Sequence, residues 1–194
     1  METRHEKAGQ RETDSTPKGT AASTEAQVRR QPDLFQEIMY LLIKLAVVAL
    51  IATLLFTFIF GALRYNNGNM NPAVKEGDLV IYYRLDKDYK ASETLVLKYE
   101  GEYQIQRVVA VAGDTVDIGE GGLMVNGAYQ QESEIYTETE RYAQGVEFPL
   151  TVPEGEVFVL SDNRTNATDS RLYGTVKIRD TYGTVMAIFR RRNL

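Results

Sequence analysis

A long uncharged apolar run constrains this chain more than any other feature of its sequence. Residues 45–63 read LAVVALIATLLFTFIFGAL, which is long enough to cross the hydrocarbon core of a bilayer as a helix. Lys44 lies at the inner edge of the run, where a long side chain can reach the lipid headgroups. The sequence therefore predicts a transmembrane helix over residues 39–64.

The surroundings of this run favour a permanent anchor. A cleavable signal peptide has a shorter apolar core near residue 1 and small residues after it, and neither feature is present here. Arg29, Arg30 and Lys44 precede the run, whereas Arg64 is the first basic residue after it. This bias predicts a single-pass protein of the cell membrane with a cytoplasmic N-terminus and an extracytoplasmic C-terminal domain.

Residues 1–38 are predicted to form the cytoplasmic tail. The first 32 residues are rich in Glu, Arg, Thr, Ser and Gln and carry few large apolar side chains. Such a stretch cannot bury enough surface to fold alone, so we predict that it is disordered.

Residues 65–194 are predicted to form a β domain. Runs of β-branched and aromatic residues alternate with turn signals such as EGD, AGD, EGG, NG and PEG. Strands are expected at residues 79–83, 94–99, 103–111, 115–118, 156–160 and 182–189. The predicted fold class is therefore mainly β: one N-terminal transmembrane helix followed by an antiparallel sheet or partly open barrel.

Composition excludes several kinds of function. The chain has no cysteine, so disulfides, thiol nucleophiles and thiolate metal sites are excluded. Its single histidine, His5, lies in the polar tail, which argues against a Ser-His-Asp triad or a histidine metal site. The formal net charge of −5 indicates no broad basic surface for nucleic acid. We predict no metal and no organic cofactor.

Four stretches, in chain order, resemble the sequence boxes of the bacterial type I signal peptidase family. They are GNMNP at 68–72, KEGDLV at 75–80, QRVVAVAGDTV at 106–116 and SDNRTNATDSRLYG at 161–174. The fourth is the most specific, because DNR followed by DSR and Gly is unusual by chance. The resemblance implies a mostly β domain that cleaves secretory signal peptides at the outer membrane face. It also implies a substrate that lies extended along a strand, with small side chains in two shallow pockets.

The resemblance further implies where the catalytic groups would stand. The family uses a serine nucleophile, a lysine base kept neutral by burial, and a second serine beside the lysine. In this sequence the three positions hold Asn69, Gln106 and Ala167. An amide is a poor nucleophile, glutamine does not titrate near neutrality, and a methyl group donates no hydrogen bond. Because loss of such a unit costs on the order of a millionfold in turnover, we predict that no catalytic site is intact.

The same resemblance marks two further groups of residues. The first matches positions that line the family's substrate pockets, although the same residues are equally well explained as core: Met70, Pro72, Val74 and Ile105. The second is predicted to form a structural polar network: Arg107, Asp114, Asp162, Asn163, Arg164, Asp169, Ser170 and Arg171.

Three functions remain open at this stage. The leading hypothesis is a pseudoenzyme that binds secreted preproteins or pilin subunits and assists pilus assembly, because it resembles the pilus-associated members of Gram-positive bacteria that lack the dyad. A sortase is a further candidate partner, and membrane lipid surrounds the anchor.

The second hypothesis is an active endopeptidase with a displaced dyad, and the third is a membrane scaffold that no longer binds peptides. A displaced dyad would need a serine from Ser92, Ser133, Ser161 and Ser170, and a lysine such as Lys75, Lys98 or Lys177. Two alternatives are weaker. One is an engineered inactive form, and the other is attack by Asn69 on its own backbone.

Overall fold

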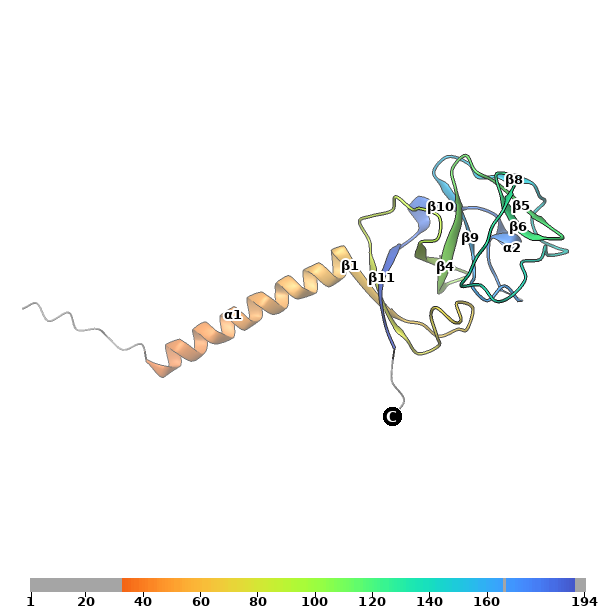
Figure 1. Ribbon diagram of the computed structural model, residues 1–194. Coiled ribbons are helices and arrows are strands. Elements are labelled where there is room, and N and C mark those ends of the chain that lie inside the picture. The colour runs from red at the N-terminus through yellow and green to blue at the C-terminus, as the bar shows by residue number, and fades with distance from the viewer. Residues whose placement is uncertain (1–32, 166, 191–194) are drawn as a thin grey trace, which may run out of the picture. The chain divides into compact units, whose positions relative to one another are not determined.

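The computed structural model describes residues 33–165 and 167–190 (Figure 1). The chain divides into two compact units, residues 1–42 and 43–194. The disorder predicted for residues 1–32 concerns residues outside those described.

In chain order the helices and strands are α1 (Leu34–Leu54), the π-helix η1 (Leu55–Ile59), β1 (Phe60–Arg64), β2 (Leu79–Tyr83), β3 (Thr94–Tyr99), β4 (Glu102–Val111), β5 (Thr115–Gly119), β6 (Gly122–Val125), β7 (Ala128–Tyr129), β8 (Leu150–Thr151), β9 (Glu156–Leu160), α2 (Ser170–Tyr173), β10 (Val176–Lys177), the 3₁₀-helix η2 (Ile178–Asp180) and β11 (Gly183–Phe189).

The apolar segment forms a helix that both begins and ends before the predicted bounds of 39–64. It covers Leu34–Ile59, counting α1 and η1 together, and is long and apolar enough to cross a membrane. No other helix among the described residues meets that test. The large apolar side chains of α1 are exposed, an arrangement that suits a lipid environment better than water.

Residues 60–64, which the sequence placed in the helix, form strand β1 instead. β1 pairs antiparallel with β2, with Phe60 opposite Tyr83. This pairing supplies hydrogen-bond partners for the backbone of β1. Gly61 allows this approach, because a Cβ at that position would come within 2.1 Å of the Tyr82 ring. Apolar composition alone does not distinguish the end of a helix from a strand, and here the pairing with β2 decides.

Two antiparallel sheets form the rest of the fold, which confirms the predicted mainly β class. The larger has seven strands in the order β1-β2-β11-β3-β4-β9-β10, and the smaller has four in the order β7-β6-β5-β8. The last strand, β11, therefore inserts between two early strands, and it is drawn in blue beside them in Figure 1. Five predicted strands match β2, β3, β4, β5 and β9 to within a residue, and the sixth matches β11.

Three buried clusters hold these sheets together. The first includes Tyr65, Met70, Val74, Val80, Tyr82, Val96 and Ile105. The second fills the space between the two sheets and includes Ala110, Val116, Ile118, Leu123, Val152, Phe158 and Leu160. The third includes Tyr89, Leu95, Leu97, Val108, Val157 and Val159. The first cluster lies next to the predicted dyad positions and therefore sets their surroundings.

Candidate functional site

Gln106 occupies the predicted base position and is fully bonded within the protein. It lies on β4 opposite Leu95 of β3 and is 1% exposed. Its Nε2 donates to the Thr168 carbonyl at 2.7 Å and to Gln104 Oε1 at 3.0 Å. Its Oε1 accepts a hydrogen bond from the Tyr173 hydroxyl at 2.6 Å. A buried amide with all its groups paired is a structural element, and it has no proton to exchange near neutral pH.

The partner hydroxyl of Tyr173 is fixed as a hydrogen-bond donor. Asp169 caps α2 by accepting from the Arg171 N–H, and this short helix carries Tyr173. The ring of Tyr173 stacks on Tyr99, with a centroid separation of 4.5 Å. Burial, reinforced by the nearby Asp169 charge, raises the pKa of Tyr173 far above its ordinary value. At neutral pH this hydroxyl stays protonated and cannot replace the missing base.

Asn69 occupies the predicted nucleophile position, in the loop between β1 and β2. Its carbonyl accepts from the Asn163 N–H at 2.8 Å, and its own N–H donates to Asn67 Oδ1 at 3.1 Å. Among the described residues, no hydrogen bond involves the Asn69 side chain. In serine peptidases the N–H of the nucleophile commonly stabilises the oxyanion. In this conformation that N–H donates to the side chain of Asn67, two residues earlier in the chain.

Ala167 occupies the supporting-serine position and is 3% exposed. Its carbonyl accepts a hydrogen bond from the Tyr142 hydroxyl at 2.9 Å, so Tyr142 anchors this part of the loop. The next residue, Thr168, supplies the carbonyl that binds Gln106. Asn163 therefore contacts the Asn69 position, and Thr168 contacts the Gln106 position. None of the three predicted positions offers a group able to attack a peptide or accept a proton.

The predicted substrate-pocket residues lie mostly in the core. Met70, Val74 and Ile105 are between 0% and 1% exposed, and all three belong to the first buried cluster. Met70 Sδ also accepts from the Asp162 N–H at 3.4 Å, whereas Pro72 is exposed. Solvent does not reach the first three side chains, so they act as core residues in this conformation.

Two ion pairs form the centre of the predicted polar network, and the Asp162 and Asp169 carboxylates of both are buried. Arg107 binds both carboxylate oxygens of Asp162, at 2.7 and 2.6 Å, and this bond raises the pKa of Arg107. Arg171 binds both oxygens of Asp169 at 2.9 Å, and both side chains are almost completely buried. Arginine forks of this kind fix the orientation of both partners.

Arg164 extends this network to a distant loop. It is 1% exposed and donates to the Ser161 carbonyl at 2.6 Å and to Thr139 Oγ1 at 2.6 Å. It also forms an ion pair with Glu132 at 2.6 Å. The fourth sequence box therefore holds the irregular segment between β7 and β8 against the domain.

The remaining predicted network residues have separate local roles. Ser170 Oγ accepts from the Val159 N–H at 3.0 Å. Asn163 contacts the Asn69 carbonyl. Asp114 lies apart from the network, in the turn between β4 and β5, where it accepts from the Val111 N–H. Its carboxylate closes that turn because the short side chain can reach backbone groups nearby.

The structure adds network members that sequence patterns do not identify. They are Gln104, Glu132, Thr139, Thr168 and Tyr173. Tyr173 and Thr168 lie inside the fourth box, so the sequence could have indicated that they belong to the network. The other three lie in segments whose contacts arise only from folding.

A displaced dyad receives no support from the side chains. Among the described residues, no hydrogen bond joins a serine hydroxyl to a lysine amine. Ser161 is fully buried, and its hydroxyl has no hydrogen-bond partner within the described structure. Ser92 and Ser133 are exposed, and the Ser92 carbonyl binds Arg107.

Several known proteins of similar sequence are named signal peptidase I. A family model described as "Signal peptidase, peptidase S26" matches residues 38–190. The signal peptidase I of Bacillus amyloliquefaciens is 27% identical over 139 residues, which cover 64% of this chain and 72% of that protein. The probable signal peptidase I-1 of Synechocystis is 29% identical over 162 residues, which cover 76% of this chain and 80% of that protein.

A solved structure of similar sequence is that of a signal peptidase I from Enterococcus faecalis. It is 25% identical to this chain, with a TM-score of 0.43. The alignment covers 51% of this chain and 97% of that one.

Proposed function

This chain belongs to the signal peptidase family, peptidase S26, and on that premise we propose that it is a membrane-anchored member without peptidase activity. In this proposal it binds secreted precursors, such as pilin subunits, as extended segments and assists pilus assembly. A sortase acting on the same subunits is the expected second partner. The pilus role rests on resemblance to family members that lack the dyad.

The observation that carries the proposal is the bonding of Gln106. Its amide fills the base position with three neutral hydrogen bonds and is 1% exposed. Asn69 and Ala167, at the other two positions, supply neither a nucleophile nor a supporting hydroxyl. Loss of a complete catalytic unit removes on the order of a millionfold in turnover.

The proposed membrane arrangement follows from the apolar helix and its flanks. In this arrangement Leu34–Ile59 spans the bilayer, residues 1–33 lie in the cytoplasm, and the β domain from Phe60 onward lies outside. The excess of basic residues before the span supports this orientation.

A non-binding membrane scaffold is the second candidate, and one observation favours it. Met70, Val74 and Ile105 are closed to solvent, so a client side chain can contact them only if the loop of residues 67–74 moves. The two candidates therefore differ in whether a client binds the folded domain at all.

The first experiment tests cleavage and binding together. The full chain in detergent is incubated with a preprotein and with a pilin precursor, and products are read by mass spectrometry. We expect no cleavage by the native chain or by Asn69→Ala. The restored variant Asn69→Ser/Gln106→Lys/Ala167→Ser tests whether the framework still accepts a substrate, and cleavage by it alone would support the proposal strongly.

Other outcomes separate the alternatives. Site-specific cleavage by the native chain that survives Asn69→Ala would overturn the proposal and require a displaced nucleophile. Absence of both cleavage and pilin binding, measured by crosslinking in membranes, would favour the scaffold. Pilin and sortase genes next to this gene would support the pilus role.

A further inference from the structure

The segment of residues 135–141 has the form of a strand but no strand partner. It follows a turn closed by the Ile135 N–H and the Glu132 carbonyl, and it belongs to neither sheet. Burial alternates along it with the two-residue period of an extended chain. The inward side chains are Ile135, Thr137 and Thr139, and the outward ones are Tyr136, Glu138 and Glu140.

This segment is nevertheless held firmly in place. Thr137 Oγ1 accepts from the Arg164 N–H at 2.9 Å, and Thr139 Oγ1 accepts from the buried Arg164 guanidinium at 2.6 Å. The Glu140 carbonyl accepts from Arg171 at 3.1 Å. The two buried arginines of the fourth box therefore fix an extended backbone at the surface.

The backbone donors of the segment are unused. Within residues 33–165 and 167–190, no N–H group of residues 136–142 donates a hydrogen bond to another protein atom. A fixed extended backbone with free donors is the template to which a further strand can pair.

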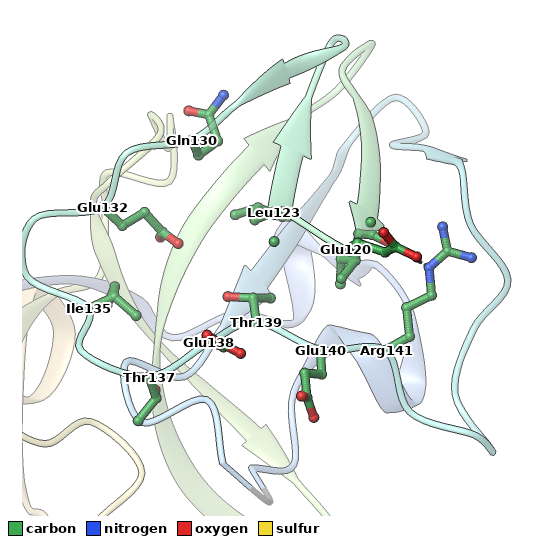
Figure 2. Close-up of a pocket in the computed structure, with 14 residues that line it drawn as sticks. Glu120, Leu123, Gln130, Glu132, Ile135, Thr137, Glu138, Thr139, Glu140 and Arg141 are labelled. Atoms are coloured by element: carbon green, nitrogen blue, oxygen red, sulfur yellow. Dashed lines mark hydrogen bonds between the residues drawn. The ribbon is translucent and has the colours of Figure 1, made fainter.

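A cavity of about 730 Å³ lies directly beside this template. The β5–β6 hairpin forms one wall, with Ile118, Glu120 and Leu123, and residues 135–141 form the other. Figure 2 shows Leu123 above Thr139 and Glu120 beside Arg141. We name this space, between residues 118–123 and 135–141, the hairpin slot.

The charge around the hairpin slot specifies what it can hold. Among the described residues, Glu120, Glu138 and Glu140 have carboxylates without any hydrogen bond or ion pair. The two other charges are already neutralised, since Glu132 pairs with Arg164 and Arg141 with Asp117. No group of acidic residues in the described part of the chain converges closely enough to hold a metal ion. Carboxylates spaced along a wall instead suit separate cationic side chains.

We infer that the hairpin slot binds an extended, lysine- or arginine-rich segment of a client protein as an added strand. The client backbone pairs with alternate N–H groups of residues 136–140, those that face one edge of the segment. Its basic side chains face Glu120, Glu138 and Glu140. The inference rests on the proposed function only in taking the client to be a secreted protein, because this site is separate from Asn69 and Gln106.

The test uses the full chain in detergent and fluorescein-labelled peptides about seven residues long, which match the segment at about 3.3 Å per residue. One peptide alternates Lys and Thr, and its control alternates Glu and Thr. Fluorescence anisotropy is expected to show binding of the basic peptide only. Glu120→Gln/Glu138→Gln/Glu140→Gln should weaken that binding about tenfold at low salt. The matched control Glu76→Gln/Glu102→Gln/Glu154→Gln removes the same charge from exposed positions elsewhere and should leave binding unchanged.

A second measurement tests strand addition rather than charge alone. Two basic peptides are N-methylated at alternate residues, one at odd and the other at even positions. An added strand pairs through one edge, so one methylated peptide should bind like the parent and the other should lose binding. Equal affinities of the two methylated peptides would overturn the strand geometry. Equal weakening of binding by the slot variant (Glu120, Glu138 and Glu140 to Gln) and by the control variant (Glu76, Glu102 and Glu154 to Gln) would overturn the site.

The result is independent of the outcome for the dyad positions. If the proposed pilin binding fails but the basic peptide binds the hairpin slot, the inference stands and the client identity is wrong. If pilin binds equally well to the Glu120/Glu138/Glu140 variant, the inference fails and the proposed function stands.

Discussion

Two neighbouring regions carry the resemblance to signal peptidases, and they handle buried polarity in opposite ways. Asp162 and Asp169 are buried carboxylates, and each accepts two hydrogen bonds from one arginine guanidinium. At Gln106, the position is neutral and its partners are a hydroxyl, an amide and a carbonyl. Buried charges need counter-charges, whereas a buried amide needs only hydrogen bonds. The charged framework predicted from the family's sequence boxes is thus present beside a neutral residue at the predicted base position.

This difference predicts unequal sensitivity to substitution. In the ion-paired region, one altered residue leaves a buried charge alone. In the neutral region, removal of one partner leaves an unpaired polar group, and only the introduction of a charge costs more. Four measurements test that ranking, from the largest expected effect to the smallest.

Asp169→Asn should have the largest effect. It leaves the buried guanidinium of Arg171 without its counter-charge, and we expect the free energy of unfolding to fall by about 3–5 kcal/mol. The chain has no tryptophan, so unfolding in guanidinium chloride is followed by circular dichroism. Asp180→Asn is the control, because the Asp180 side chain is 64% exposed and lies 3.7 Å from Arg179. Similar losses of unfolding free energy in both variants would show that burial of the ion pair does not determine its effect on stability.

Gln106→Lys should have an intermediate effect that depends on pH. Burial disfavours the ammonium form, so the lysine pKa falls below its unfolded value of about 10.4. Between the two pKa values the unfolded chain binds more protons, and stability therefore rises with pH. We expect a loss of roughly 2 kcal/mol at pH 7 and partial recovery at pH 9. Gln131→Lys, at an exposed position, should show no such recovery, and a flat profile for Gln106→Lys would contradict a buried site.

High pH should weaken the fold through two buried tyrosines. Burial raises the pKa of both Tyr65 and Tyr173 above the ordinary value of 10.0. Stability from these groups is complete below pH 10 and is lost as pH rises further, because the unfolded chain releases protons that the folded chain keeps. Each tyrosine contributes a slope of up to about 1.4 kcal/mol per pH unit. Tyr173→Phe should make the decline shallower in alkaline unfolding curves, whereas Tyr136→Phe, at a 79% exposed side chain, should not.

Asn69→Ala should have the smallest effect. No hydrogen bond among the described residues uses its side chain, so we expect the free energy of unfolding to change by less than about 0.5 kcal/mol. Asn67→Ala is the informative neighbour, because it frees the Asn69 N–H and should cost about 1 kcal/mol. A larger loss for Asn69→Ala than for Asn67→Ala would mean that the Asn69 side chain has a structural role.

Much of the fold could be predicted because its signals are local. The strands at 79–83, 94–99 and 156–160 match β2, β3 and β9 residue for residue, since alternating β-branched residues bounded by turns are sufficient there. The short strands β7, β8 and β10 have two residues each and carry no such pattern. The helix end was misplaced because Phe60–Arg64 is apolar enough for either structure, and only β2 distinguishes them.

The candidate site shows the same division. The family resemblance pointed to positions 69, 106 and 167, and their assignment as catalytic positions without catalytic groups stays a prediction. The burial of Met70, Val74 and Ile105 could not be predicted, because pocket-lining and core residues have the same apolar character. The Glu132–Arg164 pair was also hidden, since a charged residue gives no sign of its partner at this sequence distance.

The sequence by itself determined the apolar helix and the β class, and it showed that residues 69, 106 and 167 are Asn, Gln and Ala. The helix and the β class follow from the composition of short segments. Only the tertiary structure decided that Gln106 is locked by Thr168 and Tyr173, that the pocket residues are closed, and that residues 135–141 stand unpaired beside a cavity. Those properties depend on which distant segments share a hydrogen bond or exclude water, and long-range packing sets both.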